Sequence, residues 1–123
     1  MTPQEITLHQ RSGILEVAWE DGTRHELPAE YLRVFSPSAE VQGHSPDQAV
    51  LQHGKKNVKI SAVDPQGNYA VKLTFSDGHD SGIYSWTYLF DLGNNYERNW
   101  ADYLKRLEEA GKSRESQFIA VGR

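Results

Sequence analysis

Alternating apolar and polar residues predict six short strands, which fall into two groups of three along the chain. In the first group, Leu15, Val17 and Trp19 would share one face of a strand. In both groups an Asp-Gly pair, at 21–22 and at 77–78, separates the second strand from the third. Because Asp-Gly tolerates the positive φ angles of a tight turn, each pair predicts a hairpin. The expected strands are 5–9, 14–19, 24–27, 58–63, 69–75 and a short one that ends at Ile83.

The two groups of strands resemble two copies of one unit, each followed by a short helix. The matched positions are Trp19 with Phe75, Leu27 with Ile83, and Tyr31-Leu32 with Tyr88-Leu89 after one inserted residue. Pro28 suits the first turn of one helix, and Ser85 is a suitable N-cap for the other. Each sheet would leave one apolar face bare, and packing the copies together buries both faces. We therefore expect an α+β, β-rich fold in which two pseudo-repeated three-strand-plus-helix units form one domain.

A longer C-terminal helix is expected after the second unit. Its apolar stripe consists of Tyr96, Trp100, Tyr103, Leu104 and Leu107. Gly111 is the natural end of this helix, so the domain would span residues 1–111. The segment 41–56 has no clear period and is expected to be a long loop, which in compact domains is often functional or disordered. Residues 112–123 are expected to form a flexible tail.

The composition narrows the function classes. The chain of 123 residues has no cysteine, which excludes disulfides, thiolate nucleophiles and cysteine-ligated zinc or iron–sulfur sites. Its formal net charge of −4 gives no attraction to nucleic acid or to anionic membranes. No apolar run approaches the roughly 20 residues needed to cross a bilayer, and no signal-peptide pattern is present. We therefore expect a cytoplasmic protein with neither nucleic-acid nor membrane partners.

The five histidines are the obvious candidates for chemistry. His9 and His25 fall in predicted strands, where an ordinary surface position is the simpler interpretation. His44 and His53 share the 41–56 loop with an aspartate, Asp47, and could meet around a metal ion, although their spacing fits no known template. His79 follows the second Asp-Gly turn, where neighbouring carboxylates could tune its pKa or orient it toward a metal. From the turn residues alone the preferred interpretation of His79 is a hydrophilic hairpin tip, because turn chemistry already explains Asp77 and Gly78.

No nucleophile stands beside a suitable base, so we expect no catalytic residue and no enzymatic activity; an enzyme with an unfamiliar site is the weaker alternative. The densest feature is an aromatic group that consists of Tyr84, Trp86, Tyr88, Phe90, Tyr96, Trp100 and Tyr103. Such a group is ordinarily the core of a small domain, but it can also bind sugars, quaternary ammonium ions or proteins. Its corner at Tyr84, Ser85 and Trp86 is a candidate interaction surface, together with His44 and His53.

Two motifs carry a resemblance to a known family. They are Trp19-x-Asp21-Gly22 followed by Leu27-Pro28-Ala29-Glu30-Tyr31-Leu32-Arg33, and Phe75-x-Asp77-Gly78-His79 followed by Gly82-Ile83-Tyr84-Ser85-Trp86-x-Tyr88-Leu89. Over roughly residues 5–108 the chain resembles the amino-terminal domain of gamma-butyrobetaine hydroxylase, and with it the small stand-alone bacterial proteins of unknown function that share this domain. The hydroxylase chemistry lies in a separate jelly-roll domain with a ferrous His-x-Asp set, which this chain lacks. The resemblance therefore implies no oxygenase activity.

The resemblance also implies where a metal would lie. In the hydroxylases this domain looks like a structural zinc module, with three cysteines after the Tyr-Leu-Arg segment and one histidine after the second turn. Here the cysteine positions fall on Ser36, Ser38 and about Val41, and only His79 matches a ligand. Hydroxyls and a valine cannot replace thiolates for zinc, so we expect the site to be lost and no cofactor to be bound.

Two functional hypotheses follow. The first is a non-catalytic accessory or binding domain that acts through contacts with an unknown protein partner. A similar domain is fused to P-loop ATPases implicated in iron–sulfur cluster delivery, so this resemblance implies a role near metal-cofactor assembly. The alternative is a small metal- or ligand-binding protein that uses His79 with His44, His53 or nearby carboxylates.

Overall fold

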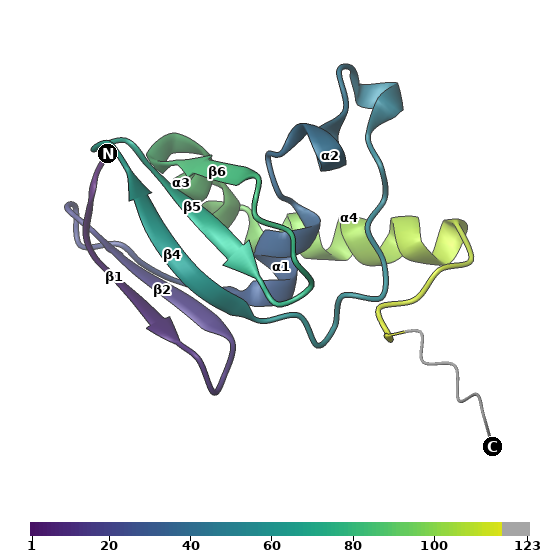
Figure 1. Cartoon of the computed structure of the whole chain (residues 1–123), viewed down its shortest axis with the longest axis horizontal. Coiled ribbons are helices and arrows are strands. Elements are labelled where there is room, and N and C mark those ends of the chain that lie inside the picture. Colours follow the sequence, from purple (N-terminus) through teal and green to yellow (C-terminus); the bar gives the residue numbers. More distant parts are fainter. Residues whose placement is uncertain (117–123) are drawn as a thin grey trace.

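The computed structural model describes residues 1–116 of the chain. The elements in chain order are β1 (Pro3–His9), β2 (Ile14–Trp19), β3 (Arg24–Pro28), α1 (Ala29–Val34), α2 (Ala39–Gln42), the 3-10 turn η1 (Pro46–Gln48), β4 (Ile60–Gln66), β5 (Ala70–Phe75), β6 (Gly82–Ser85), α3 (Trp86–Asn94) and α4 (Tyr96–Glu109). Figure 1 shows the strands gathered at one end of the molecule, with α4 reaching toward the other end and the segment that carries α2 and η1 standing above it. Within residues 1–116, no helix has the length and apolar character that crossing a membrane requires.

The strands form two antiparallel three-stranded sheets, with orders β1-β2-β3 and β4-β5-β6. Both sheets contribute their inner faces to one core, as expected from the bare face that each would otherwise expose. Leu15 and Val17 of the first sheet and Leu73 of the second are fully buried in this core. The fold class and the two packed pseudo-repeats predicted from the sequence are therefore confirmed.

The two units are more alike than the sequence match indicated, because the inserted residue lies elsewhere. Leu15 pairs with Leu27 in the first sheet, and the corresponding Val71 pairs with Tyr84 in the second. Leu27 therefore matches Tyr84, and both are buried, whereas Ile83 is 47% exposed. The match of Leu27 with Ile83 was wrong: the insertion lies between the Asp-Gly turn and β6, where strand alternation gives no signal.

Helix α4 covers the far side of α1 and forms a second, smaller cluster. Tyr103 and Leu107 of α4 pack there with Val34 at the end of α1. The Tyr31 hydroxyl donates to the carbonyl of Leu92 at 2.6 Å and accepts from the side chain of Asn99 at 3.0 Å, which ties α1 to α3 and α4. The first unit is thereby fastened to the helix of the second unit and to α4.

Three segments differ from the sequence predictions. The 41–56 loop contains the end of α2 and the turn η1, so it is not structureless. Strand β4 runs to Gln66 and shortens the expected 64–68 turn, because Asp64 and Pro65 still pair with β5 at an exposed sheet edge. Residues 112–116 are not a loose tail: the carbonyls of Ser113 and Arg114 accept hydrogen bonds from the backbone at 54 and 56. The rest of the expected tail, 117–123, lies outside the described residues.

Arg114 holds this C-terminal segment in place. Its guanidinium makes two hydrogen bonds of 2.9 and 2.7 Å to the carboxylate of Glu30 on α1. It also lies over the ring of Trp100, 5.3 Å from the centroid. Bidentate pairing and stacking are the geometries in which arginine binds most specifically. The segment therefore braces the C-terminal end of the 41–56 region against α1 and α4.

Candidate functional site

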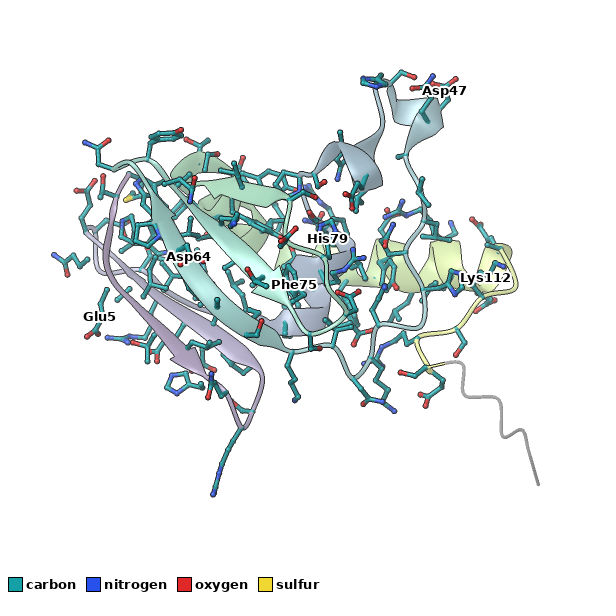
Figure 2. All side chains as sticks on the ribbon, viewed as in Figure 1. Glu5, Asp47, Asp64, Phe75, His79 and Lys112 are labelled. Atoms are coloured by element: carbon teal, nitrogen blue, oxygen red, sulfur yellow. The ribbon has the colours of Figure 1, made fainter. Side chains whose placement is uncertain are left out.

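His79 is a buried residue rather than a hydrophilic hairpin tip, with 6% of its surface exposed. It ends the turn between β5 and β6, where its carbonyl accepts a hydrogen bond from Phe75 and its N–H donates to Asp77 Oδ1. Figure 2 shows His79 in the interior of the molecule near α1, whereas Asp47 lies at the outer tip of the segment that carries η1. The turn thus places an imidazole against the chain that leaves α1.

Each ring nitrogen of His79 has a polar partner: Ser36 at one and Glu40 at the other. Ser36 Oγ lies 2.8 Å from Nε2, and Glu40 Oε2 lies 3.3 Å from Nδ1. A carboxylate only accepts, so Nδ1 carries the proton of the neutral ring and Ser36 donates its hydroxyl hydrogen to Nε2. The Ser36 oxygen also accepts from the backbone N–H of Ser38 at 3.2 Å. Both nitrogens of the imidazole therefore have partners inside the protein.

This Ser–His–Glu arrangement has the connectivity of a catalytic triad without its access. Ser36 has 0% of its surface exposed, so a substrate carbonyl could not approach its hydroxyl. The side chain of Glu40 is 70% exposed, which weakens its hold on the ring. The three residues therefore act as a hydrogen-bonded joint between the α1–α2 connection and the second sheet, and the geometry does not support acyl transfer.

Beside this joint, Asp77 forms ion pairs with two basic side chains. Arg33 Nε lies 2.9 Å and Lys55 Nζ 2.6 Å from Asp77 Oδ2. Burial raises the pKa of Asp77, but the hydrogen bonds from Lys55 and from the His79 N–H, with the Arg33 charge, outweigh it and lower the pKa to about 2. Burial, followed by the charge of Arg33, lowers the pKa of His79 below its usual value, although Glu40 and Asp77 oppose that shift. His79 is accordingly held in its neutral form.

The residues at this joint do not fit the zinc ion that the hydroxylase resemblance implies. Ser36 Oγ is bonded to His79 and Ser38 Oγ to Ser81 Oγ at 2.7 Å, so the two hydroxyls pair within the protein. Neutral hydroxyls are poor zinc ligands compared with thiolates or imidazoles. Val41 is 4% exposed and supplies no donor atom. A buried Arg33 Nη1 without a partner, the single such atom found among the described side chains, adds positive charge that a cation would meet.

The loop histidines do not join His79 in a metal cluster. Within residues 1–116, no group of three or more His, Cys, Asp or Glu side chains could hold a metal ion. His44 is exposed and His53 is half-buried, and the structure records no side-chain hydrogen bond or ion pair between either of them and His79 within that range. The proposed combination of His79 with His44 and His53 therefore receives no geometric support.

The predicted interaction corner has one buried residue and two that are half-buried. Tyr84 has 0% of its surface exposed, and its hydroxyl donates to the carbonyl of Leu32, so it cannot contact a partner. Ser85 caps α3 by accepting from the N–H of Tyr88 at 3.2 Å. Trp86 is half-buried and donates its indole N–H to the carbonyl of Asn68 at 2.8 Å. The corner assignment was wrong for Tyr84, because the inserted residue ahead of β6 turns Tyr84 inward.

A hollow lies instead between α4 and the segment that carries α2 and η1. This hollow, here called the α4 groove, has a volume of about 230 Å³. Its lining residues are Val34, Phe35, Val41, Gln42, Ala49, Val50, Leu51, Gln52, Tyr103 and Arg106. Its inner side chains are apolar and buried, while Val50 at the edge is 55% exposed. The hollow thus combines an apolar floor with an apolar residue that is open to solvent at its edge.

Hydrogen bonds to backbone carbonyls hold the wall of the α4 groove. The N–H of Val50 donates to the carbonyl of Val41 at 2.8 Å, and the Tyr103 hydroxyl donates to the carbonyl of Gln52 at 2.8 Å. Gly43 has a φ of 68°, and a Cβ there would lie 2.6 Å from the carbonyl oxygen of Gln48. The close approach at Gly43 allows the chain to fold back on itself. The groove is therefore preformed, which lowers the entropic cost of binding.

Sequence patterns identified these features unequally. His79, Ser36 and Ser38 were found through the family resemblance, and the structure brings these three residues together. Glu40, Arg33 and the α4 groove were missed. Arg33 lies within the Tyr-Leu-Arg segment of the first motif, which was the available signal, whereas the groove depends on tertiary contacts between segments more than 50 residues apart.

Comparisons with known proteins agree with the fold. The family model described as "Gamma-butyrobetaine hydroxylase-like, N-terminal" matches residues 6–90. Two NMR solution structures are similar: one has 49% identity and a TM-score of 0.82, covering 99% of this chain and 96% of the other. The second has 47% identity and a TM-score of 0.80, covering 99% and 92%.

A third similar structure matches a smaller part of this chain. It is the crystal structure of a protein of unknown function from Acidithiobacillus ferrooxidans that belongs to the DUF971 family. It has 40% identity and a TM-score of 0.63, and the match covers 75% of this chain and 92% of the other. No curated protein matches the chain.

Proposed function

The chain belongs to the gamma-butyrobetaine hydroxylase-like N-terminal domain family, and from that premise we propose that it is a non-catalytic accessory domain that binds a protein partner through the α4 groove. The observation that carries this proposal is the groove itself: a preformed surface hollow with a buried apolar floor and an exposed apolar edge at Val50. Apolar pockets of this kind receive the anchoring side chains of protein partners. The Ser36–His79 joint, by contrast, is closed to ligands.

The proposed domain works without zinc. At the position where the resemblance implies a zinc ligand set, the hydroxyls of Ser36 and Ser38 join the α1–α2 connection to the β5–β6 connection. The partner is proposed to act near metal-cofactor assembly. That part of the proposal rests on the other domains to which similar domains are fused, namely ATPases implicated in iron–sulfur delivery. No residue of this chain supports it directly.

Two matched surface variants test the proposal. Val50→Asp places a carboxylate at the edge of the groove, and Ile83→Asp does the same at a similarly exposed apolar residue on β6, 47% exposed against 55% for Val50. Both changes should alter stability by no more than about 0.5 kcal/mol, because surface substitutions rarely cost more. Partners captured from native extract by the wild-type chain should be lost with Val50→Asp and retained with Ile83→Asp.

The result that contradicts the proposal is equally specific. Equal capture by the wild type and both variants would exclude the groove as the binding surface. Loss of the partner with Ile83→Asp alone would move the interface to the outer face of the second sheet. Thermal unfolding of each variant, followed by circular dichroism, separates a lost interaction from a lost fold.

A further inference from the structure

The size of the α4 groove limits what it can hold. Its volume of about 230 Å³ is below the range of roughly 300–1,000 Å³ that is typical of small-molecule and cofactor pockets. Its floor is formed by Val34, Val41 and Tyr103, which are 7%, 4% and 1% exposed. A hollow this small with an apolar floor suits one bulky apolar side chain better than a nucleotide or other cofactor.

A cationic side chain lies at the edge of the groove, where it is also ion-paired with Asp102. Arg106 is the one charged side chain among the described residues that line the groove, and it is 47% exposed. The contact recorded for its guanidinium within residues 1–116 is an approach of 3.5 Å between Nε and Asp102. Because a guanidinium carries five N–H donors in a planar fork, this contact leaves the two Nη nitrogens for a second carboxylate.

We propose that the α4 groove recognises a segment of a partner protein in which a bulky apolar residue is adjacent to an aspartate or glutamate. The inference rests on the proposed function and adds the class of sequence that the partner presents. The apolar side chain fills the hollow above Val41 and Tyr103, and the neighbouring carboxylate accepts hydrogen bonds from Arg106. An apolar floor with a cationic edge is complementary to that pair of side chains.

Short peptides provide the probe, because they isolate this chemistry from the rest of any partner. N-acetyl-leucyl-glutamate amide and its leucyl-glutamine analogue differ only in the negative charge. Each would be titrated to 10 mM into the ¹⁵N-labelled full chain and followed in ¹H–¹⁵N correlation spectra. A ligand of this size should bind with a dissociation constant on the order of 1 mM. The glutamate peptide should bind about threefold more tightly, as expected for one exposed ion pair.

The variants define how the inference fails. Shifts should concentrate at residues 41–52 and 103–106, disappear in Val50→Asp and persist in Ile83→Asp, and the preference for glutamate should vanish in Arg106→Gln. Shifts in the groove with equal affinity for both peptides would overturn the proposed sequence class while leaving the groove as a protein-binding site. The absence of shifts in the groove at 10 mM would also overturn it. Capture of partners that depends on Val50 would still support the proposed function in either case, so the two failures are distinguishable.

Discussion

The turn between β2 and β3 and the turn between β5 and β6 follow the same backbone path in different surroundings. In the first, Trp19 N–H donates to the Thr23 carbonyl and Thr23 N–H to Asp21. In the second, Phe75 N–H donates to the His79 carbonyl and His79 N–H to Asp77. The central glycines of both turns have a φ of 91°. Thr23 and His79 therefore occupy equivalent positions, and only the second is buried.

The two turns differ in burial because a different segment of the chain packs against each of them. The chain that leaves α1 lies over the second turn and brings Ser36 to His79, whereas Asp21 of the first turn is exposed and makes no recorded ion pair within residues 1–116. The helix of the second unit reaches back to the first sheet in a related way: Asn94 at the end of α3 accepts from His25 Nε2 at 3.0 Å. Each unit thus uses the end of its helix to cover a histidine of the other, which is how a repeated motif becomes one domain.

The largest contrast between the turns should appear at their aspartates. Asp77→Ala leaves Arg33, only 8% exposed, buried without its carboxylate, and we expect a loss of about 3 kcal/mol in the free energy of unfolding. Asp21→Ala removes a single exposed side-chain hydrogen bond to Thr23 and should cost about 0.5–1 kcal/mol. Urea unfolding followed by tryptophan fluorescence measures both values. Equal losses at the two aspartates would contradict the contrast.

Acid should affect the same interaction. The Asp77 carboxylate has a folded-state pKa of about 2, below its ordinary value of 3.8, so it contributes stability above pH 3.8. That contribution should be lost as the pH falls through the range from 3.8 to about 2, because the unfolded chain binds the proton first. In Asp77→Asn this part of the acid dependence should be absent, which provides the control.

How far the sequence predicted these features depends on whether the signal was local. The hairpins, the glycine at each turn and the Gly111 helix end were predicted, because they depend on neighbouring residues. The burial of Tyr84, the brace formed by Arg114 and the α4 groove were not, because each depends on residues that are far apart in the chain. Alternation with a period of two also cannot locate a single inserted residue, which is why Leu27 was matched with Ile83.

A second contrast concerns the contact between α3 and the first sheet. A Cβ added at Gly93 would lie 2.2 Å from His25 Nδ1, and the His25 ring is held by Trp19 and Asn94. Although alanine in a helix is intrinsically favoured over glycine by about 1 kcal/mol, the steric overlap should outweigh this gain and Gly93→Ala should destabilise the protein by about 2 kcal/mol. In a His25→Ala background the same substitution should become neutral or stabilising. A double-mutant cycle of melting temperatures measures this coupling, and additive effects would contradict it.

A smaller effect is expected at the Ser36–His79 joint. Ser36→Ala leaves His79 Nε2 and the Ser38 N–H without their partner in a buried site, and should cost about 1–2 kcal/mol. Thr23→Ala, at the position of the first turn that is equivalent to His79, serves as the control and should cost less, because within residues 1–116 the Thr23 side chain has no buried hydrogen-bond partner like Ser36. Chemical denaturation of Ser36→Ala, His79→Gln and the double variant should show coupling between the two residues. Additive losses would mean that they contribute to stability independently.

The smallest effect expected is a pH dependence that belongs to the second turn alone. The pKa of His79 in the folded protein is below its ordinary value of 6.5, because burial and the Arg33 charge outweigh the opposing carboxylates of Glu40 and Asp77. Above pH 6.5 both the folded and the unfolded chain hold the ring neutral, so His79 adds no pH dependence there. As the pH falls below 6.5, the unfolded chain binds a proton that the folded chain does not, so stability should decrease until the folded-state pKa is reached. Unfolding free energies of the wild type and His79→Gln between pH 8 and pH 5 should therefore diverge only below about 6.5. Parallel profiles would show that the joint does not hold His79 neutral, and the contrast between the two turns would then rest on Asp77 alone.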